Sequence, residues 1–559
     1  MTAEEHQKVG RTPLPNPSPQ GGRGSERGRA EDEASPPILL PESVGGVATA
    51  ALVIGLGNIT SRLLGLAREL VIAALFGATG ATSAFRTATR VSTAVYDLLL
   101  SGATTSALVP VFTEYATKGQ TADLSRVVST FVNLTIAVLG LVVAALVLFA
   151  PLLVAALGAE AEFFDLAVDL TRITLPSIVL LGVSGILTSV LYARRSFTVT
   201  AIVAAVYNLG IIVAALALHN VLSIYSLAIG LGLGALLQII VQIPALRGLG
   251  YRPSIDLRHP GVRQVLRLYA PVFVGMFASY AVVVIDTFLA WQTGTDSVAA
   301  MAFATTLIQF PIGLVGAATS LAILPSLSRL ALNTDADGER EFVGMLVRGL
   351  KLVVLLIVPV GVAMVVLREP LVAALFQRLA FDERATERTA LALLAYSPQL
   401  PFVVVDQLLI VAYYARKETR TPVVVGFACI GVYLAVALVT FMPWGMAGLA
   451  FANAVQNSAH AVVLYCLLAG RYAVLRDAAL ARFLAAIATG GALSALATWF
   501  AAGELTAPLT TGGPIPRLAT ILLIGALALG VYWLCLRLLR VQELGEITDL
   551  ARRLTRRGR

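Results

Sequence analysis

The chain has 559 residues, of which 57% are hydrophobic and 13% are charged, and its mean hydropathy is +0.83. Soluble domains carry about 25% charged residues, so this composition excludes a soluble globular protein and indicates a polytopic membrane protein. The net charge of +8 would suggest a nucleic-acid partner for a soluble chain, but here the basic residues lie in short loops between apolar segments, where they indicate membrane orientation.

The first 44 residues differ in composition from the rest of the chain. The stretch from Leu14 to Pro37 is rich in Pro, Gly, Ser and charged residues and contains no apolar segment around which it could fold. We therefore expect residues 1–44 to form a disordered cytoplasmic tail. This tail has no hydrophobic region followed by a small-residue cleavage site, so we expect the first membrane span to direct insertion.

Long apolar segments follow this tail almost to the end of the chain. A helix needs about 20 mostly apolar residues to cross roughly 30 Å of hydrocarbon. This criterion predicts an all-α fold with about fourteen transmembrane helices. They lie at residues 46–77, 83–113, 125–157, 164–193, 198–218, 222–246, 265–292, 297–328, 343–367, 389–415, 421–442, 445–469, 478–502 and 517–539. The second and eighth are rich in Thr, Ser and Ala, as expected for helices that line a polar cavity.

The first predicted span contains two arginines, Arg62 and Arg68. A charged side chain at bilayer depth costs about 2.5 to 3.5 kcal/mol on insertion scales, so it persists mainly where it faces a hydrated cavity and has a function. A guanidinium group matches two phosphate oxygens and stays charged. We therefore predict a cavity that binds an anionic ligand. Arg86 and Arg90 on the second span are four residues apart, share one helix face and add to this candidate binding site.

A structural interpretation of the first two arginines competes with this one. Arg62 and Arg68 are six residues apart, which is about 9 Å along a helix but some 240° around it, so a straight helix would not point both at one ligand. Both side chains could extend towards the lipid head groups or pair with Glu69 near a helix end. The glycines of this span favour a bent helix along a cavity instead.

Positive charge alternates between the loops that join the predicted spans. We assign the basic set of loops to the cytoplasm, and an even number of spans then places both termini there. The stretch from Arg368 to Arg388 is an exception, because it mixes both signs. The basic loops contain Lys118, Arg126, Arg194, Arg195, Arg247, Arg252, Arg258, Arg263, Arg340, Arg348, Arg416, Lys417, Arg420, Arg471 and Arg476.

Two stretches of the first half recur in the second half at nearly the same offset. ATTSALVPVFTEYA at residues 103–116 aligns without gaps on ATSLAILPSLSRLA at residues 318–331, and Tyr-Ala-Arg-Arg at residues 192–195 matches Tyr-Ala-Arg-Lys at residues 414–417. Short strings can also coincide by chance, but two matches in chain order favour a duplicated six-helix unit. A six-helix unit keeps its orientation when it is copied, so we predict two parallel repeats around a central cavity.

The predicted domains follow from the spans and the repeat. We expect the binding site to lie between the two six-helix lobes. The tail at 1–44 precedes an N-terminal lobe at 45–246, a cytoplasmic linker at 247–264, a C-terminal lobe at 265–470, two additional transmembrane helices at 471–540 and a basic cytoplasmic tail at 541–559.

Several stretches of the sequence resemble a known family. Over about residues 46–540 they are similar to the MurJ (MviN) lipid II flippases of the multidrug/oligosaccharidyl-lipid/polysaccharide exporter superfamily. The resemblance lies in Ser61-Arg62-Leu63-Leu64-Gly65-Leu66-Ala67-Arg68-Glu69, Phe76-Gly77-Ala78, Thr82 with Ala84-Phe85, Gly102-Ala103 leading to Val109-Pro110, Phe310-Pro311, Leu324-Pro325-Ser326-Leu327-Ser328 and Thr421-Pro422.

This resemblance implies a function. It implies fourteen helices in the bacterial inner membrane and translocation of undecaprenyl-diphosphate-linked peptidoglycan precursor from the inner to the outer leaflet by alternating access. The expected partners are this glycan lipid and the membrane, without nucleic acid, and we expect a monomer. Several polar positions of the family pattern differ here, which leaves the glycan open: Ser83 stands for Asp, Tyr96 and Asp97 for paired arginines, Ser101 for Glu, and Thr305 and Thr306 for an Asp-Arg pair.

Moving a bulky anionic head group uphill requires an energy source. The chain contains no GxxxxGK[ST] nucleotide-binding string, so we expect coupling to an ion gradient or to the membrane potential and no bound cofactor. Asp286, in the middle of the seventh span, could bind Na⁺ or H⁺, and Asp406 on the tenth span is its rival. The stretch from Val423 to Val439 on the eleventh span is almost wholly apolar, so we expect no polar partner for Asp286 there.

Other function classes fit parts of the sequence. A flippase for another polyprenyl-linked polysaccharide unit and a non-transporting scaffold both remain open. A cation-coupled drug antiporter of the same superfamily would favour an acidic cavity, which the arginines argue against. An enzyme acting on polyprenyl diphosphates would need a metal or general-base cluster, and we expect no catalysis. The histidines and cysteines are scattered, at His6, His219, His259, His460, Cys429, Cys466 and Cys535, without metal or disulfide spacing.

Overall fold

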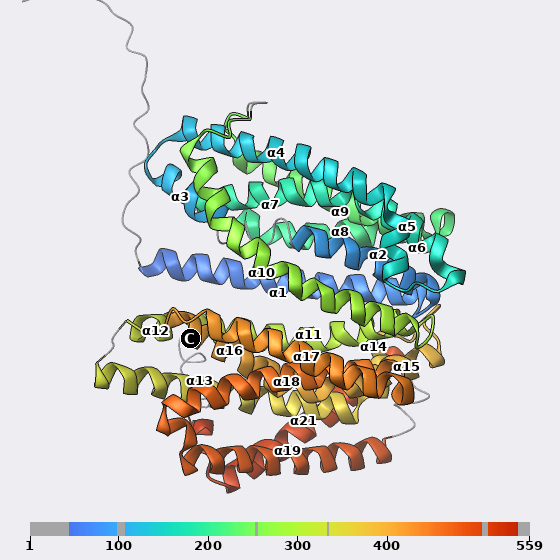
Figure 1. Cartoon of the computed structure of the whole chain (residues 1–559). Coiled ribbons are helices and arrows are strands. Elements are labelled where there is room, and N and C mark those ends of the chain that lie inside the picture. Colours follow the sequence, from blue (N-terminus) through green and yellow to red (C-terminus); the bar gives the residue numbers. More distant parts are fainter. Residues whose placement is uncertain are drawn as a thin grey trace, which may run out of the picture. The chain divides into compact units, whose positions relative to one another are not determined.

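A computed structural model of the chain describes residues 44–97, 107–251, 255–322, 324–332, 335–505 and 513–545, which all belong to one compact unit, Ser43–Arg559. The described residues form helices joined by short turns and include no β-strand, which confirms the predicted all-α fold (Figure 1). The tail predicted at 1–44, apart from Val44, the end of the tail predicted at 541–559, and the Gly102-Ala103 string lie outside the described residues.

The first half of the chain forms nine α-helices within the described residues. They are α1 (Val44–Phe76), α2 (Gly80–Tyr96), α3 (Val109–Thr117), α4 (Thr121–Leu148), α5 (Ala150–Ala156), α6 (Ala161–Thr174), α7 (Ser177–Ala193), α8 (Phe197–Leu222) and α9 (Tyr225–Gln242), followed by the 3₁₀ turn η3 (Ile243–Leu246).

The second half continues with helices of similar lengths, and two long helices follow it. They are α10 (Pro260–Trp291), α11 (Ser297–Ala322), α12 (Leu324–Leu330), α13 (Ala336–Val366), α14 (Arg368–Phe376), α15 (Glu383–Tyr396), η4 (Ser397–Gln399), α16 (Leu400–Ala415), α17 (Arg420–Trp444), α18 (Met446–Arg471), η5 (Ala473–Arg476), α19 (Ala478–Glu504) and α21 (Pro514–Leu538).

Ten helical segments in the described part of the chain are long and apolar enough to cross a membrane. The helices α1, α2, α10 and α18 are not among the ten, so the count of fourteen stays a prediction. The ten segments are 121–148, 161–193, 197–222, 225–246, 297–315, 337–366, 383–415, 420–444, 478–504 and 514–538.

Helix boundaries recur between the two halves at the offsets of the two sequence matches. In the register of the first match, the start of α4 at Thr121 corresponds to the start of α13 at Ala336. In the register of the second match, α6 (Ala161–Thr174) corresponds end to end to α15 (Glu383–Tyr396). The turns recur too. Arg195 and its counterpart Lys417 both adopt left-handed backbone conformations, with φ of 59° and 60°, and so do Ser223 and Gly445, with φ of 47° and 55°. This recurrence extends the two short matches to whole helices and supports the prediction of a duplicated unit.

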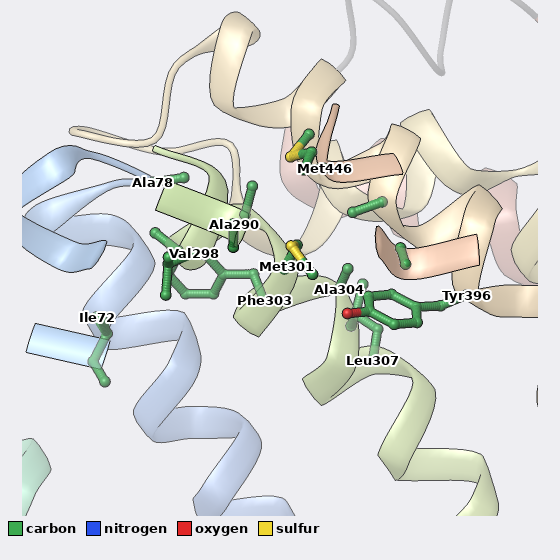
Figure 2. Close-up of a cluster of buried hydrophobic side chains, with 14 of the residues drawn as sticks. Ile72, Ala78, Ala290, Val298, Met301, Phe303, Ala304, Leu307, Tyr396 and Met446 are labelled. Carbon is green, nitrogen blue, oxygen red and sulfur yellow. The ribbon is translucent and has the colours of Figure 1, made fainter. Parts of the chain in front are cut away.

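The two halves share one hydrophobic core. In Figure 2, Ile72 of α1 lies on one side of a buried cluster and Tyr396 of α15 on the other, with Phe303 and Met301 of α11 between them. Hydrogen bonds join the halves at the same level. The Trp291 indole nitrogen donates to the Thr87 hydroxyl at 3.0 Å, as expected of a buried tryptophan. The core thus holds α1 and α2 against α10 and α11.

Candidate functional site

Two of the four predicted site arginines share one buried carboxylate. Glu69 of α1 is 1% exposed, and Arg68 donates to its Oε1 from Nε at 3.2 Å and from Nη2 at 2.8 Å. Arg86 of α2 donates to both oxygens of the same carboxylate. A buried carboxylate requires such partners, because an unpaired charge out of water is costly. The structure therefore contains the pairing of Arg68 with Glu69 that was the structural alternative.

Neighbouring helices orient these two guanidinium groups. Arg68 donates from Nη1 to the Asn208 side-chain oxygen of α8 at 3.0 Å, and the Asn208 amide nitrogen donates to the Ala204 carbonyl at 3.1 Å. The guanidinium of Arg86 lies 5.2 Å from the ring centre of Phe303 on α11, a cation–π distance. Arg86 thus reaches from α2 to the second half of the chain, while Arg68 stays partly exposed.

Arg90 and Asp286 form a second pair across the two halves. Arg90 Nη1 lies 3.3 Å from the Asp286 carboxylate of α10, and it also donates to the Thr287 hydroxyl. The Tyr433 hydroxyl of α17 donates to the other Asp286 oxygen at 2.7 Å. The expectation that the eleventh span offers Asp286 no polar partner is therefore wrong. It failed because a tyrosine in an apolar run carries a hydroxyl at the end of an aromatic ring.

Arg62 forms no ion pair among the described residues. Its Nη1 donates only to the Gln309 carbonyl of α11, at 3.4 Å, and its side chain is exposed. Its guanidinium lies against Gly313, where a Cβ atom would come within 1.6 Å of Nη1. A glycine at residue 313 is therefore required for Arg62 to lie across α11. Gly313 has no chemistry of its own, so sequence patterns did not single it out.

Positive charge exceeds negative charge at this junction of α1, α2, α10 and α11. Among the described residues, three of the four arginines share two carboxylates, Glu69 and Asp286, and Arg62 pairs with neither. The side chains of Arg68 and Arg90 are 26% and 25% exposed, so neither is closed off by the surrounding helices. Such an excess of accessible cations attracts an anion and disfavours a free cation.

The second candidate for ion coupling, Asp406, has a histidine partner. His460 Nδ1 of α18 lies 2.7 Å from the Asp406 carboxylate of α16, and His460 Nε2 lies 3.1 Å from the Pro422 carbonyl of α17. The sequence showed His460 only as one of four scattered histidines. No group of three or more His, Cys, Asp or Glu side chains that could hold a metal ion occurs within the described ranges.

The residues that replace the family's polar positions have local roles in the described part of the chain. The Ser83 hydroxyl accepts from the Ala299 backbone N–H at 3.1 Å and so binds the first turn of α11. Thr305 and Thr306 donate to carbonyl groups of their own helix at 2.8 and 3.0 Å. Asp97 also has a polar interaction, and Ser101 lies outside the described residues.

Comparisons with known proteins agree on one family. The family model described as lipid II flippase MurJ matches residues 72–519. The lipid II flippase MurJ of Burkholderia cenocepacia is 32% identical over 426 residues, which cover 73% of this chain and 81% of that protein. The probable lipid II flippase MurJ of Vibrio cholerae is 30% identical over 510 residues, which cover 85% of this chain and 96% of that protein. Arg62 and Arg68 precede the region that the family model matches.

Solved structures show the same fold. A lipid II flippase MurJ in an inward closed conformation superposes with a TM-score of 0.71 at 23% identity, covering 88% of this chain and all of that one. An inward-facing multidrug resistance MATE family transporter of the MOP superfamily superposes with a TM-score of 0.61 at 15% identity, covering 77% of this chain and 99% of that one. These likenesses concern the fold alone.

Proposed function

Because this chain belongs to the MurJ family of lipid II flippases, we propose that it translocates lipid II, the undecaprenyl-diphosphate-linked peptidoglycan precursor, from the inner to the outer leaflet of a bacterial membrane. The substrate is a lipid-linked glycan, so the activity is transport and no bond of the substrate is broken. The ten apolar helical segments of the described chain agree with a multi-pass membrane protein.

The charge at the junction of the halves is the observation that carries this proposal. A diphosphate presents several anionic oxygens, and arginine binds such groups through paired N–H donors. Arg62 forms no ion pair in the described structure, and Arg68 and Arg90 are partly exposed. A diphosphate that enters here forms an ion pair with Arg62 first. It then competes with Glu69 for Arg68 and with Asp286 for Arg90. Arg86, the most buried of the four, holds Glu69 in place.

Alternating access requires the contacts between the halves to open and close. The end of α1 touches the α14–α15 turn, where the Ala380 N–H donates to the Ala74 carbonyl at 3.1 Å. The loop charges assign this end to the outer side of the membrane and both chain termini to the cytoplasm. Opening this end while the opposite end closes would expose the arginines to the outer leaflet. The lobes at 45–246 and 265–470 are the bodies that we propose to move.

The energy for uphill transport comes, in this proposal, from an ion gradient or from the membrane potential. Asp286 links α10 to α2 and α17, and Asp406 links α16 to α18. In this proposal, an ion that binds either carboxylate changes these hydrogen bonds and so the packing of the helices that they join. A monomer suffices for the cycle, since both halves of the junction belong to one chain.

A flippase for another polyprenyl-linked polysaccharide unit is the main alternative. The positions taken by Ser83, Thr305 and Thr306 carry no charge in this chain, so the contacts that select the glycan differ from the family pattern. A cation-coupled drug antiporter of the same superfamily would share the fold, but the excess of arginine over carboxylate disfavours cationic cargo.

Complementation tests the proposal directly. We expect the wild-type chain to restore growth to a strain depleted of its own lipid II flippase, and Arg62→Ala and Arg68→Ala to reduce rescue, because both remove a donor for the diphosphate. Arg340→Ala is the matched control, since this side chain is 80% exposed, outside the junction. Immunoblots of membrane fractions must show equal amounts of each variant.

Two outcomes would count against the proposal. Equal rescue by all the variants would remove the arginines from the mechanism. Absence of rescue by a correctly inserted wild-type chain would favour the polysaccharide alternative.

A further inference from the structure

One side-chain hydrogen bond occurs at matching positions in both halves of the chain, with different chemistry. In the first half, the Ser184 hydroxyl of α7 donates to the Gln238 side-chain oxygen of α9 at 3.1 Å. The counterparts of these residues in the second half are Asp406 of α16 and His460 of α18, and they lie 2.7 Å apart. The offset between the two pairs is the one that relates the turns at Arg195 and Lys417.

Each pair also binds the same third helix of its half. The Gln238 side-chain nitrogen donates to the Val203 carbonyl of α8 at 3.2 Å. His460 Nε2 lies 3.1 Å from the Pro422 carbonyl of α17, the helix that matches α8. Each half therefore has a three-helix junction held by one side chain. In the first half neutral groups suffice for this purpose, so helix packing does not explain why the second half uses two ionisable groups.

The position of the His460 ring between two acceptors determines its preferred protonation state. A neutral imidazole has one N–H, so it can donate to Asp406 or to the Pro422 carbonyl but not to both. The other nitrogen then points its lone pair at an acceptor. An added proton lets both nitrogens donate, and it also turns a pair with one net negative charge into a neutral ion pair, which is less costly within a membrane.

The surroundings of this pair are polar and partly accessible. Asp406 and His460 are both partly exposed, whereas Ser184 and Gln238 are buried. On the same face of α18, Asn457 donates to Gln399 at 2.5 Å and to Asn453 at 3.2 Å, so amide groups extend the polar strip along the helix. A strip of this kind offers a path for water to the pair.

Other titratable groups lie on the helices that pack around this junction. The α17 helix carries the Cys429 thiol, which Asp406 influences electrostatically. Lys351 of α13 lines one cavity with Val405 of α16, and it bonds Glu543 at 2.6 Å. Further charged groups on the surrounding helices include Asp286 of α10, held by Arg90 and Tyr433, and Arg388 of α15, paired with Asp296. Nearer the helix ends, Arg416 after α16 pairs with Glu339 and Arg471 of α18 pairs with Glu418, while Arg348 of α13 and Arg420 of α17 are exposed.

We propose that Asp406 and His460 form a proton-binding site and that H⁺ is the ion to which this carrier couples. The coupling rests on the proposed flippase function, whereas the site stands on its geometry. The pair takes up one proton when its side of the carrier opens to one aqueous phase and releases it to the other. Uptake forms an N–H bond on the His460 ring and release breaks it, so the complete cycle leaves no net covalent change. A ring that donates from both nitrogens leaves no lone pair for Na⁺.

Spectroscopy of the purified full-length protein tests proton binding without any cargo. In protein labelled with ¹⁵N-histidine, we expect one signal at neutral pH from a ring protonated at both nitrogens, and we expect His460→Gln to remove it. His219→Gln, which changes a histidine near the end of α8, must leave it in place. A signal from His460 with one protonated nitrogen throughout the pH range in which the protein is folded would overturn the site.

Transport in proteoliposomes tests the coupling. We expect an imposed pH gradient to speed lipid II translocation by the wild type, and we expect Asp406→Ser combined with His460→Gln to lose this response. The double variant places the neutral Ser–Gln pair of the first half at the matching positions of the second half, so a hydrogen bond between α16 and α18 is retained. Wild-type transport that responds to a Na⁺ gradient and not to pH would overturn H⁺ coupling. A wild type that moves no lipid II but shows the histidine signal would support the site and overturn the flippase function instead.

Discussion

At the scale of single residues, the buried carboxylate Glu69 decides what two arginines can do. It pairs with Arg68 and Arg86, and its exposure of 1% leaves it no water. Arg86 already has a buried Nε without a hydrogen-bond partner in the described structure. Loss of the carboxylate would leave a mostly buried cation next to a neutral amide, which is the costly way to break a buried ion pair.

We expect Glu69→Gln to lower the stability of the protein by about 3 to 5 kcal/mol, the range measured when one partner of a buried pair is removed. Thermal unfolding in detergent measures this loss. Glu369→Gln is the matched control, because Glu369 pairs with Arg368 at the surface with 60% of its side chain exposed, and such pairs contribute about 1 kcal/mol or less. Equal losses in both variants would show that Glu69 has no special role.

The glycine beneath Arg62 offers a test that leaves the arginine itself unchanged. In Gly313→Ala the new methyl group would overlap the guanidinium, so we expect Arg62 to turn away from α11 and rescue of the depleted strain to fall towards that of Arg62→Ala. Stability should hold or rise slightly, since alanine favours a helix by about 1 kcal/mol over glycine. Gly344→Ala, where the added atom would meet nothing within 4 Å, should keep full rescue.

At the scale of helices, one loop ion pair ties the start of α17 to the end of α18. Glu418 accepts from Arg471 at 2.9 Å and also from the Thr421 hydroxyl. These hydrogen bonds, that from Arg471 first, lower the pKa of the Glu418 carboxyl below its ordinary value. A carboxyl whose pKa is lowered by folding stabilises the folded state above its unfolded pKa of about 4.3, and this contribution disappears as the pH falls through the folded pKa.

Removal of that carboxylate should therefore matter only at higher pH. We expect Glu418→Gln to lower the Tm slightly at pH 7, and we expect the difference from wild type to vanish in acid below the folded pKa. The effect is small because half of the Arg471 side chain is exposed to solvent. Unfolding curves of both proteins over a pH series measure it. A difference that persists unchanged in acid would exclude the ion pair as its cause.

Comparison of the two halves also shows which turns and helix breaks could be predicted from the sequence. The turn before α9 has Ser223 where the turn before α18 has Gly445, and both residues adopt the left-handed conformation. The left-handed turn therefore forms at this position with serine as well as with glycine. Turn positions were in part predictable from apolar runs and from the repeat. The breaks at residues 149, 175–176 and 397–399, each within a predicted span, were not, and α2 ends at Tyr96, within the span predicted at 83–113.

At the scale of the whole molecule, the contact between the end of α1 and the α14–α15 turn holds the two halves together at one end. Gly77 has a left-handed φ of 64°, and a Cβ atom there would come within 2.3 Å of the Ala380 carbonyl oxygen. A side chain at residue 77 would push the two backbones apart, because carbonyl oxygen and methyl carbon cannot approach so closely.

We expect Gly77→Ala to lower the Tm and to weaken closure of this end, measured as faster thiol labelling of a cysteine introduced at Thr79. The matched control is Gly119→Ala. Gly119 has a similar φ of 68° but nothing within 4 Å of the added carbon, so it isolates the cost of alanine in a left-handed conformation. If both variants lost the same stability, the contact with Ala380 would contribute nothing to closure.

Composition and spacing alone were enough to predict the class of this molecule. Apolar runs separated by basic loops require a helical membrane protein, because a backbone in lipid must satisfy its own hydrogen bonds. The same logic marked Arg62, Arg68, Arg86 and Arg90 as exceptional, since charge in an apolar segment is costly. The two recurring strings indicated the duplication that the helix boundaries repeat.

Pairing was decided only in three dimensions. Only the pairing of Arg68 with its neighbour Glu69 could be proposed from the sequence. The partners of Arg90 come from distant parts of the chain: Arg90 meets Asp286 and Thr287, and Asp286 meets Tyr433. Whether a buried charge is neutralised, shared or free depends on which helices pack together. The sequence gives the residue types but not the distances between side chains on different helices. The partner of Asp406 and the glycine under Arg62 became visible for the same reason, because proximity across helices determines the charge that a ligand or a proton meets.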